Sequence, residues 1–253
     1  MNKWHRRIWL AVSVIFWLCI WQLGAMWVDQ EILLVSPLRA IQALWEMMLT
    51  EDFYIAIAGS LSRIAIGFGA ALIAGVMLAA VARFVMPVRM LLAPVMSAIK
   101  ATPVASFVIL ALIWISSKNL SGVMSFLIVR PVVYSNFLDG LDRADVKLIE
   151  MAKVFRMPFA RQIRAIYWPA AFPYLLTSVR LSLGMCWKAG IAAEVIAQPR
   201  NSIGSALQRA KVFFSTPELF AWTLAIIIIS VALEKLMMVL IRLMSRRLYD
   251  RNS

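Results

Sequence analysis

Six hydrophobic runs, each about as long as a bilayer is thick, divide this sequence. They cover residues 8–28, 64–82, 90–115, 120–138, 172–197 and 219–241. A membrane-spanning helix needs about 20 mainly apolar residues, because the hydrocarbon core is roughly 30 Å thick. Hydrophobic residues make up 62% of the 253 residues, which is too large a share for a soluble domain of this length. The pattern therefore predicts an all-α integral membrane protein with one transmembrane domain, residues 1–253.

The first run could instead be the hydrophobic part of a secretory signal peptide, because Lys3, Arg6 and Arg7 precede it. The run is long for a signal peptide, however, and no small-residue cleavage site follows it. We therefore expect residues 8–28 to be a retained first span.

Proline residues mark breaks between and within the runs. Ser36 and Pro37 begin a modest amphipathic helix after the first span. Pro94 and Pro103 interrupt the third run, so we expect that run to be bent or broken at these positions. Residues 198–217 are polar, and we expect them to form an outer loop.

The distribution of Lys and Arg predicts how the spans are oriented. With the N-terminus inside the cell, the cytoplasmic segments contain 15 Lys and Arg residues and the outer segments contain 6. Cytoplasmic loops carry an excess of these residues, so six spans with both termini in the cytoplasm are favoured. The same rule accounts for the formal net charge of +13 without nucleic acid as a partner.

Residues that support catalysis or metal binding form no recognisable motif in this sequence. It has no Gly-rich nucleotide-binding loop, no zinc-ligand spacing and no Ser/His/Asp arrangement. Cys19 and Cys186 lie inside hydrophobic runs, and His5 has no neighbouring ligand. We therefore expect neither an enzyme nor a metal or cofactor bound to this chain.

Residues 150–169 form the one long polar segment inside the hydrophobic chain. Just before and within it, apolar residues at i, i+3, i+4 and i+7 predict one face of a short helix. They are Leu148, Met151, Ala152 and Phe155. Asp145 suits the start of this helix and Pro158 ends it. The chemistry of the helix alone leaves two possibilities open: it lies on the lipid surface, or it docks on another protein.

The same segment resembles a cytoplasmic loop in the membrane subunits of ATP-binding-cassette (ABC) importers. That loop carries Glu-Ala-Ala, three residues, Gly, nine residues and Ile-x-Leu-Pro. This sequence matches it at Glu150, Ala152, Ile166 and Pro169, and differs at Met151, Arg156 and Trp168. Similarity to the nitrate, sulfonate and taurine type of permease extends from residue 60 to residue 194. It includes residues 60–63, 103–105, 138–141, 169–171 and 184–187, and Glu194.

The resemblance implies a type I ABC importer permease fold with six transmembrane helices and a cytoplasmic coupling loop, residues 139–171. It also implies a dimer of permease copies in the bacterial inner membrane, a cytoplasmic ABC ATPase dimer and an extracytoplasmic solute-binding protein. ATP and Mg²⁺ would be bound by the ATPase and not by this chain. The residues expected to couple the permease to the ATPase are Glu150, Met151, Ala152, Phe155, Arg156 and Pro169.

Arg156 stands where the family motif has Gly, which enters the left-handed backbone region without a steric clash. Arg156 could accept that conformation at a cost on the order of 1 kcal/mol. Alternatively, the helix could continue to Met157 and end at Pro158. We expect the second arrangement, with Arg156 right-handed and its side chain directed to the cytoplasm or toward an acidic patch on the ATPase.

Among the ionisable residues inside the runs, five are candidates for the translocation path. They are Lys100, Arg130, Arg180, Lys188 and Glu194. A charge at mid-bilayer costs roughly 2.5–3.5 kcal/mol on the insertion scale, so each must face protein or water. Each could be structural instead, with Glu194 paired to Lys188 or to an arginine, and we favour this for each residue singly. Lys188 is the best candidate for contact with an anionic solute, because similar permeases usually have an apolar residue there.

We therefore expect the permease subunit of an ABC importer, with a small anion such as nitrate or a sulfonate, or a vitamin precursor, as its solute. An ion-gradient-driven secondary transporter of a small anion is the alternative, and it should show an inverted repeat and acidic midplane sites. Only Glu194 and Glu234 are acidic within the six runs, and no clear repeat is present. An integral-membrane enzyme should show a polar catalytic cluster, and the sequence has none.

Overall fold

The computed structural model describes residues 3–249, which are helical and contain no strand. In the first half of the chain the helices are α1 (Lys3–Val28), α2 (Pro37–Met48), α3 (Glu51–Phe84), α4 (Met86–Ala101) and α5 (Val104–Ala111). The second half contains α6 (Ser117–Asp142), α7 (Val146–Val154), α8 (Phe159–Gln162), the π-helix η1 (Ile163–Tyr167), α9 (Trp168–Ala197), α10 (Ile203–Val212) and α11 (Thr216–Tyr249).

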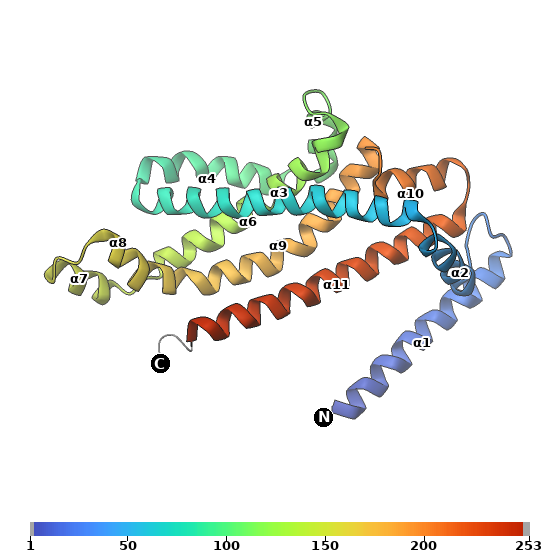
Figure 1. Cartoon of the computed structure of the whole chain (residues 1–253), viewed down its shortest axis with the longest axis horizontal. Helices are drawn as coiled ribbons and strands as arrows, with labels where there is room; N and C mark the ends of the chain where they lie inside the picture. Colours follow the sequence, from blue (N-terminus) through green and yellow to red (C-terminus); the bar gives the residue numbers. More distant parts are fainter. Residues whose placement is uncertain (1–2, 250–253) are drawn as a thin grey trace.

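Helices α3, α6 and α9 form the centre of the bundle, and α6 packs along both of the others. The α3–α6 contact is close because two glycines face each other: a Cβ added at Gly67 would collide with the carbonyl of Gly122. Small residues allow helix backbones to approach in this way inside a membrane. Helix α11 runs along one side of the bundle and α1 diverges from it (Figure 1).

Three described helices, α3, α6 and α11, are long and apolar enough to cross a membrane. In the most apolar stretch of α6, 50% is buried inside the molecule. In the most apolar stretch of α11 only 6% is buried, so α11 presents its apolar surface outward. In α1 the apolar stretch, Val12–Val28, is shorter. The predicted spans at residues 8–28 and 172–197 correspond to α1 and α9, and for these two helices the crossing stays a prediction.

The third predicted span is a bent pair, α4 and α5, whose axes meet at 103°. If this pair counts as one span, the described residues contain four candidate spans by length and composition. The break falls at Thr102 and Pro103, as Pro103 predicts. Pro94, in contrast, lies inside α4, so the helix is not broken at this proline.

Two shorter helices lie at one end of the bundle. Helix α2 begins where Ser36 and Pro37 predict, with the Ser36 hydroxyl accepting a hydrogen bond from the Arg39 N–H at 3.3 Å. Helix α10 falls within residues 198–217, where the sequence indicated only a polar loop. Its start is held by Ser202, whose hydroxyl accepts from the Ser205 N–H at 3.0 Å.

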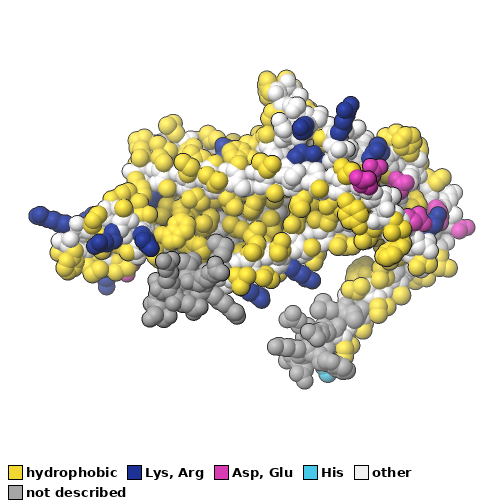
Figure 2. Space-filling model, in the orientation of Figure 1, with side chains coloured by type: hydrophobic (Ala, Val, Ile, Leu, Met, Phe, Trp, Pro, Cys, Tyr) yellow, Lys and Arg dark blue, Asp and Glu magenta, His cyan; other side chains and the backbone are white. Residues whose placement is uncertain are grey.

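Basic side chains predominate at one end of the molecule, whereas the other end carries charges of both signs (Figure 2). Lys and Arg side chains gather around α7 and α8, and Asp and Glu side chains gather near α2 and α10 (Figure 2). Hydrophobic side chains cover most of the face between them (Figure 2). This distribution is the one expected of a membrane protein whose basic end faces the cytoplasm.

Candidate functional site

Helix α7 lies with α8 at one end of the molecule, beyond the ends of α6 and α9 (Figure 1). It begins at an N-cap, Asp145, whose carboxylate accepts a hydrogen bond from the Lys147 N–H at 2.9 Å. An acidic N-cap satisfies a free backbone N–H and suits the positive end of the helix dipole. The sequence therefore predicted both the existence and the start of this helix.

The apolar residues of α7 divide into a buried and an exposed set. Ala152 is fully buried in a cluster that includes Ile166 and Tyr167. Leu148, Met151 and Phe155 are 41%, 46% and 75% exposed, so they form an uncovered stripe. Periodicity predicted one shared face for the four residues, and burial divides it: Ala152 attaches α7 to its own chain, and the other three remain exposed.

Two motif positions, Ala152 and Ile166, lie in the same buried cluster and hold α7 against the segment that leads into α9. Glu150 is exposed, and Pro169 is exposed in the first turn of α9. The motif thus combines residues that fix the helix in place with one exposed carboxylate on the helix surface.

The helix ends in a motif that the sequence did not predict. Arg156 has a φ of 47°, so it adopts the left-handed conformation, and α7 ends at Val154. The Met157 N–H donates to the Ala152 carbonyl at 2.8 Å and the Arg156 N–H donates to the Lys153 carbonyl at 3.0 Å. This pair of hydrogen bonds is a Schellman C-cap, in which Gly usually takes the position of Arg156. The expectation of a right-handed Arg156 is wrong.

The α7 region is also fastened to the ends of α3 and α4. Asp142, the last residue of α6, forms ion pairs with Arg83 at 3.2 Å and with Arg89 at 2.8 Å. Phe84, the last residue of α3, packs edge-on against Phe159 and Tyr167, with ring centroids 5.1 and 5.4 Å apart. A force applied to α7 and α8 would therefore reach several long helices and not α9 alone.

Glu194 is completely buried and paired with an arginine, as one of the two expected arrangements requires. The partner is Arg63, whose Nε and Nη2 donate to Oε1 at 3.1 and 3.0 Å. The second oxygen, Oε2, accepts from the Ser60 hydroxyl and from the Gly204 N–H. The carboxylate thus joins α3, α9 and α10. The sequence analysis missed Ser60 and Arg63 as partners, although their i, i+3 spacing puts both on one helix face.

Lys100 and Arg130 each have one contact with a neighbouring side chain, Lys100 exposed and Arg130 half-buried. The Lys100 ammonium donates to the Ser135 hydroxyl at 2.6 Å. The Arg130 guanidinium lies over the Phe126 ring, 5.2 Å from its centroid, which is a favourable cation–π distance. The Arg130 Nε is buried and has no hydrogen-bond partner among the residues described.

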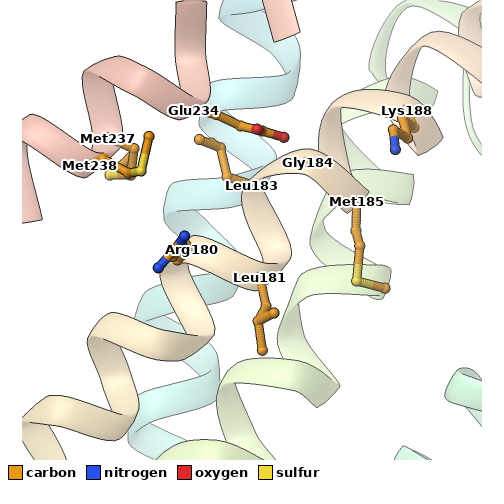
Figure 3. Close-up of a pocket in the computed structure, with 9 residues that line it drawn as sticks. All are labelled: Arg180, Leu181, Leu183, Gly184, Met185, Lys188, Glu234, Met237 and Met238. Atoms are coloured by element: carbon orange, nitrogen blue, oxygen red, sulfur yellow. The ribbon is translucent and has the colours of Figure 1, made fainter. Parts of the chain in front are cut away.

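Arg180 and Lys188 line an open cavity of about 360 Å³ between α9 and α11. Figure 3 shows both side chains on α9 and the carboxylate of Glu234 reaching toward α9 from α11. Leucine and methionine side chains complete the lining. In the sequence Glu234 lies within the last hydrophobic run, and no local pattern connects it with these two cations. The five candidates therefore separate into Glu194 in a buried ion pair, Lys100 and Arg130 with one side-chain contact each, and Arg180 and Lys188 on one cavity.

The sequence of this chain matches a protein-family model over most of its length. The model is described as the binding-protein-dependent transport system inner membrane component, and it matches residues 71–249.

Several known permeases are similar in sequence. The putative aliphatic sulfonates transport permease protein SsuC of Bacillus subtilis is 29% identical over 255 residues, which cover 99% of this chain and 89% of that protein. The taurine transport system permease protein TauC of Escherichia coli is 26% identical, with 89% and 82% covered. The nitrate import permease protein NrtB of Synechocystis is 24% identical, with 74% and 70% covered.

Solved structures share the arrangement of the helices. A bacterial ABC transporter involved in the import of alginate superposes with a TM-score of 0.60 at 15% identity, over 96% of both chains. An amino acid ABC transporter superposes with a TM-score of 0.57 at 18% identity, over 76% of this chain and 94% of that chain. At these identities the likeness concerns the fold alone.

Proposed function

We propose, from the premise that this chain belongs to the binding-protein-dependent transport system inner membrane component family, that two copies of it form the pathway of an importer and that α7 docks on a cytoplasmic ATPase. The chain is the permease subunit of a binding-protein-dependent ABC importer in the inner membrane, with the type I permease fold. ATP hydrolysis is assigned to the separate ATPase, and the dimer, the orientation of the termini and the solute are parts of the proposal.

The exposed stripe of α7 carries the proposal. Leu148, Met151 and Phe155 are uncovered, as are Val146 and Val154 of the same helix, whereas Ala152 is buried. Burying a large apolar side chain contributes about 1.5–3 kcal/mol, so three of them on one face favour contact with a partner. The basic residues around α7 hold this end of the molecule on the cytoplasmic side, where the ATPase is expected.

The internal contacts of α7 suit a part that transmits movement. Ala152 and Ile166 pack in one cluster, so α7 and the start of α9 move together. Asp142 ties the end of α6 to Arg83 and Arg89 at the ends of α3 and α4. Packed interfaces of this kind shift between discrete arrangements and do not deform continuously. A displacement of α7 by the ATPase would thereby change how α3, α6 and α9 are arranged at the other end.

The opposite end of the bundle would face the solute-binding protein. It contains α2, α10 and the acidic side chains near them (Figure 2). A solved alginate ABC transporter in complex with a periplasmic binding protein superposes on this chain with a TM-score of 0.59. With this end outside, α7 and both termini lie on the cytoplasmic side.

The solute is proposed to carry a negative charge. The similar permeases are named for sulfonates, taurine and nitrate. In this chain Arg180 and Lys188 both line the cavity between α9 and α11, where they provide positive potential along a helix of the pathway. The binding protein would select the solute, and these cations would favour its passage.

Copurification tests the docking of α7. The full chain with an affinity tag should retain the ATPase encoded with it, and Met151→Glu or Phe155→Glu should release the ATPase while the permease still inserts in the membrane. Phe213→Glu is the matched control, because Phe213 is similarly exposed, at 77%, near the opposite end. The proposal fails if wild-type permease retains no ATPase, or if all three variants retain it equally.

A further inference from the structure

The cavity between α9 and α11 contains charges of both signs on facing helices. Arg180, Gly184 and Lys188 follow one another at intervals of four residues, so they form one stripe of α9. Glu234 faces this stripe from α11 (Figure 3). Along α9 the wall of the cavity thus carries a cation, then Gly184 without a side chain, then a second cation. The opposite wall carries the carboxylate of Glu234.

Gly184 creates the gap into which the carboxylate reaches. A Cβ added at Gly184 would lie 3.1 Å from Oε1 of Glu234, so the carboxylate comes close to the α9 backbone at this level. Four residues of helix rise roughly 6 Å, which separates the level of Glu234 from that of each cation by about one turn. Charges of opposite sign therefore alternate along the cavity.

None of the three charges is neutralised within the part of the chain that the structure describes. The ion pairs found among residues 3–249 involve Arg63, Arg83 and Arg89, and none involves Arg180, Lys188 or Glu234. The three side chains are also exposed to the cavity or to solvent. A charge inside a membrane helix is costly unless water or an opposite charge meets it, so these three need either a hydrated cavity or a charged solute.

We propose that this cavity binds a small zwitterionic solute, whose anionic group contacts Arg180 or Lys188 and whose ammonium group contacts Glu234. This inference rests on the proposed function and names the chemistry of the solute that the pathway accepts. The anionic group is a sulfonate or a carboxylate, and a short carbon chain connects it to the ammonium group. A simple anion would satisfy the cations, but it would leave the carboxylate of Glu234 unpaired beside a second negative charge.

The uncharged lining fits the carbon chain of such a solute. Met185, Met237 and Met238 border the cavity together with Leu181 and Leu183. Methionine side chains are flexible and polarisable, so they adapt to short aliphatic chains of different lengths. The site therefore selects for the two charged ends and accepts variation between them.

Binding of matched probes to the full chain in lipid nanodiscs tests the inference. Taurine and ethanesulfonate share a sulfonate and a two-carbon chain and differ in the ammonium group; β-alanine and propanoate are the corresponding carboxylate pair. Wild-type protein should bind at least one zwitterion about tenfold more tightly than its ammonium-free partner. Glu234→Gln should remove this preference and leave the affinity for the simple anion unchanged or higher.

The variants separate the roles of the charges. Arg180→Gln and Lys188→Gln should lower the affinity for the zwitterion and the affinity for the simple anion by similar factors, because both probes carry the anionic group. Glu218→Gln is the control, since Glu218 lies on the same helix outside the cavity and its loss should change neither affinity. Glu234→Asp should retain part of the preference, and melting temperature should show that each variant is folded.

The inference is overturned if wild-type protein binds none of the four probes, or if it binds neither zwitterion more tightly than its ammonium-free partner. It is also overturned if Glu234→Gln lowers the affinity for both members of a pair by the same factor. Each of these results can be told apart from a failure of the proposed function. When the same preparations still retain the ATPase through α7, the importer assignment stands and only the site is wrong. When wild-type protein retains no ATPase, the docking proposal fails independently of the probe affinities.

Discussion

Arg63 and Glu194, which are 131 residues apart in the sequence, form a buried ion pair in which two guanidinium nitrogens donate to one carboxylate oxygen. Arg63 also donates to the Asn201 carbonyl at 3.0 Å, so the pair closes over the segment that leads into α10. The Ser60 hydroxyl accepts a hydrogen bond from the Ile203 N–H at 2.9 Å and fastens the same segment. One carboxylate therefore holds α10 against α3 and α9.

Removing one partner of this pair should destabilise the fold. Glu194→Gln or Arg63→Gln leaves the other charge buried without compensation, which costs about 3 kcal/mol or somewhat less, because Arg63 is partly exposed. The double variant should cost clearly less than the sum of the two single variants. Thermal unfolding in detergent measures all three, and additive losses would show that the two side chains do not interact.

The left-handed Arg156 predicts a stabilising substitution. Arg156→Gly removes the steric strain of a φ of 47° and should raise stability by about 1 kcal/mol. Arg156→Ala is the control, because it removes the charge and keeps the strain. If glycine and alanine variants melt at the same temperature, the strain is absent. Both variants lack the positive charge of Arg156. A loss of ATPase association that both variants share therefore belongs to the charge and not to the strain.

Substitutions at two nearby residues of α7 should have different effects, one on the stability of the permease and the other on its association with the ATPase. Ala152→Asp inserts a charge into the cluster that contains Ile166 and Tyr167, so the permease itself should be destabilised by more than 2 kcal/mol. Glu150→Lys changes an exposed side chain, so it should leave folding unchanged and weaken coupling to the ATPase. Melting temperature combined with ATPase copurification distinguishes them, and an unchanged melting temperature in Ala152→Asp would contradict the packing described above.

The charge of Lys188 should matter for transport more than its size. Lys188→Met should lower uptake of a labelled sulfonate or nitrate severalfold, whereas Lys188→Arg should retain most of it, because only the second keeps a cation in the cavity. The effect of Lys188→Met should diminish at high ionic strength, where exposed charges are screened. Equal uptake by both variants, with unchanged salt dependence, would give Lys188 a structural role.

Local signals in the sequence were sufficient for the long helices and for some helix ends, but not for α8, η1 and α10. Ser36, Asp145 and Pro103 mark boundaries that the structure has, because capping and proline act within one turn of the chain. Arg156 shows the limit of such reasoning. Pro158 does disfavour helix at Met157, but the helix responds by ending three residues earlier than the sequence predicted, in a hydrogen-bonded cap.

The composition of the charged clusters could not be read from local patterns. Arg63 and Glu194 meet only because α3, α9 and α10 pack together, and nothing near either residue specifies the other. Glu234 approaches Gly184 for the same reason, across two helices that the sequence does not register against each other. Ala152 and Phe155 were assigned to one face by periodicity, but burial depends on which neighbour covers each, and only Ala152 is covered.

The π-helix η1 sets the rotational phase of the coupling region. It joins α8 to α9 without a break, so α8, η1 and α9 form one continuous screw in which the π turn holds one residue more than an α turn does. Each residue of an α-helix turns the chain by about 100°. Deleting one residue from Ile163–Tyr167 would therefore let this segment become an α turn and keep α8 in phase with α9, whereas deleting a second residue would rotate α8 by roughly 100° around the axis of α9. The number of residues in this segment therefore fixes how α8 is rotated relative to α9.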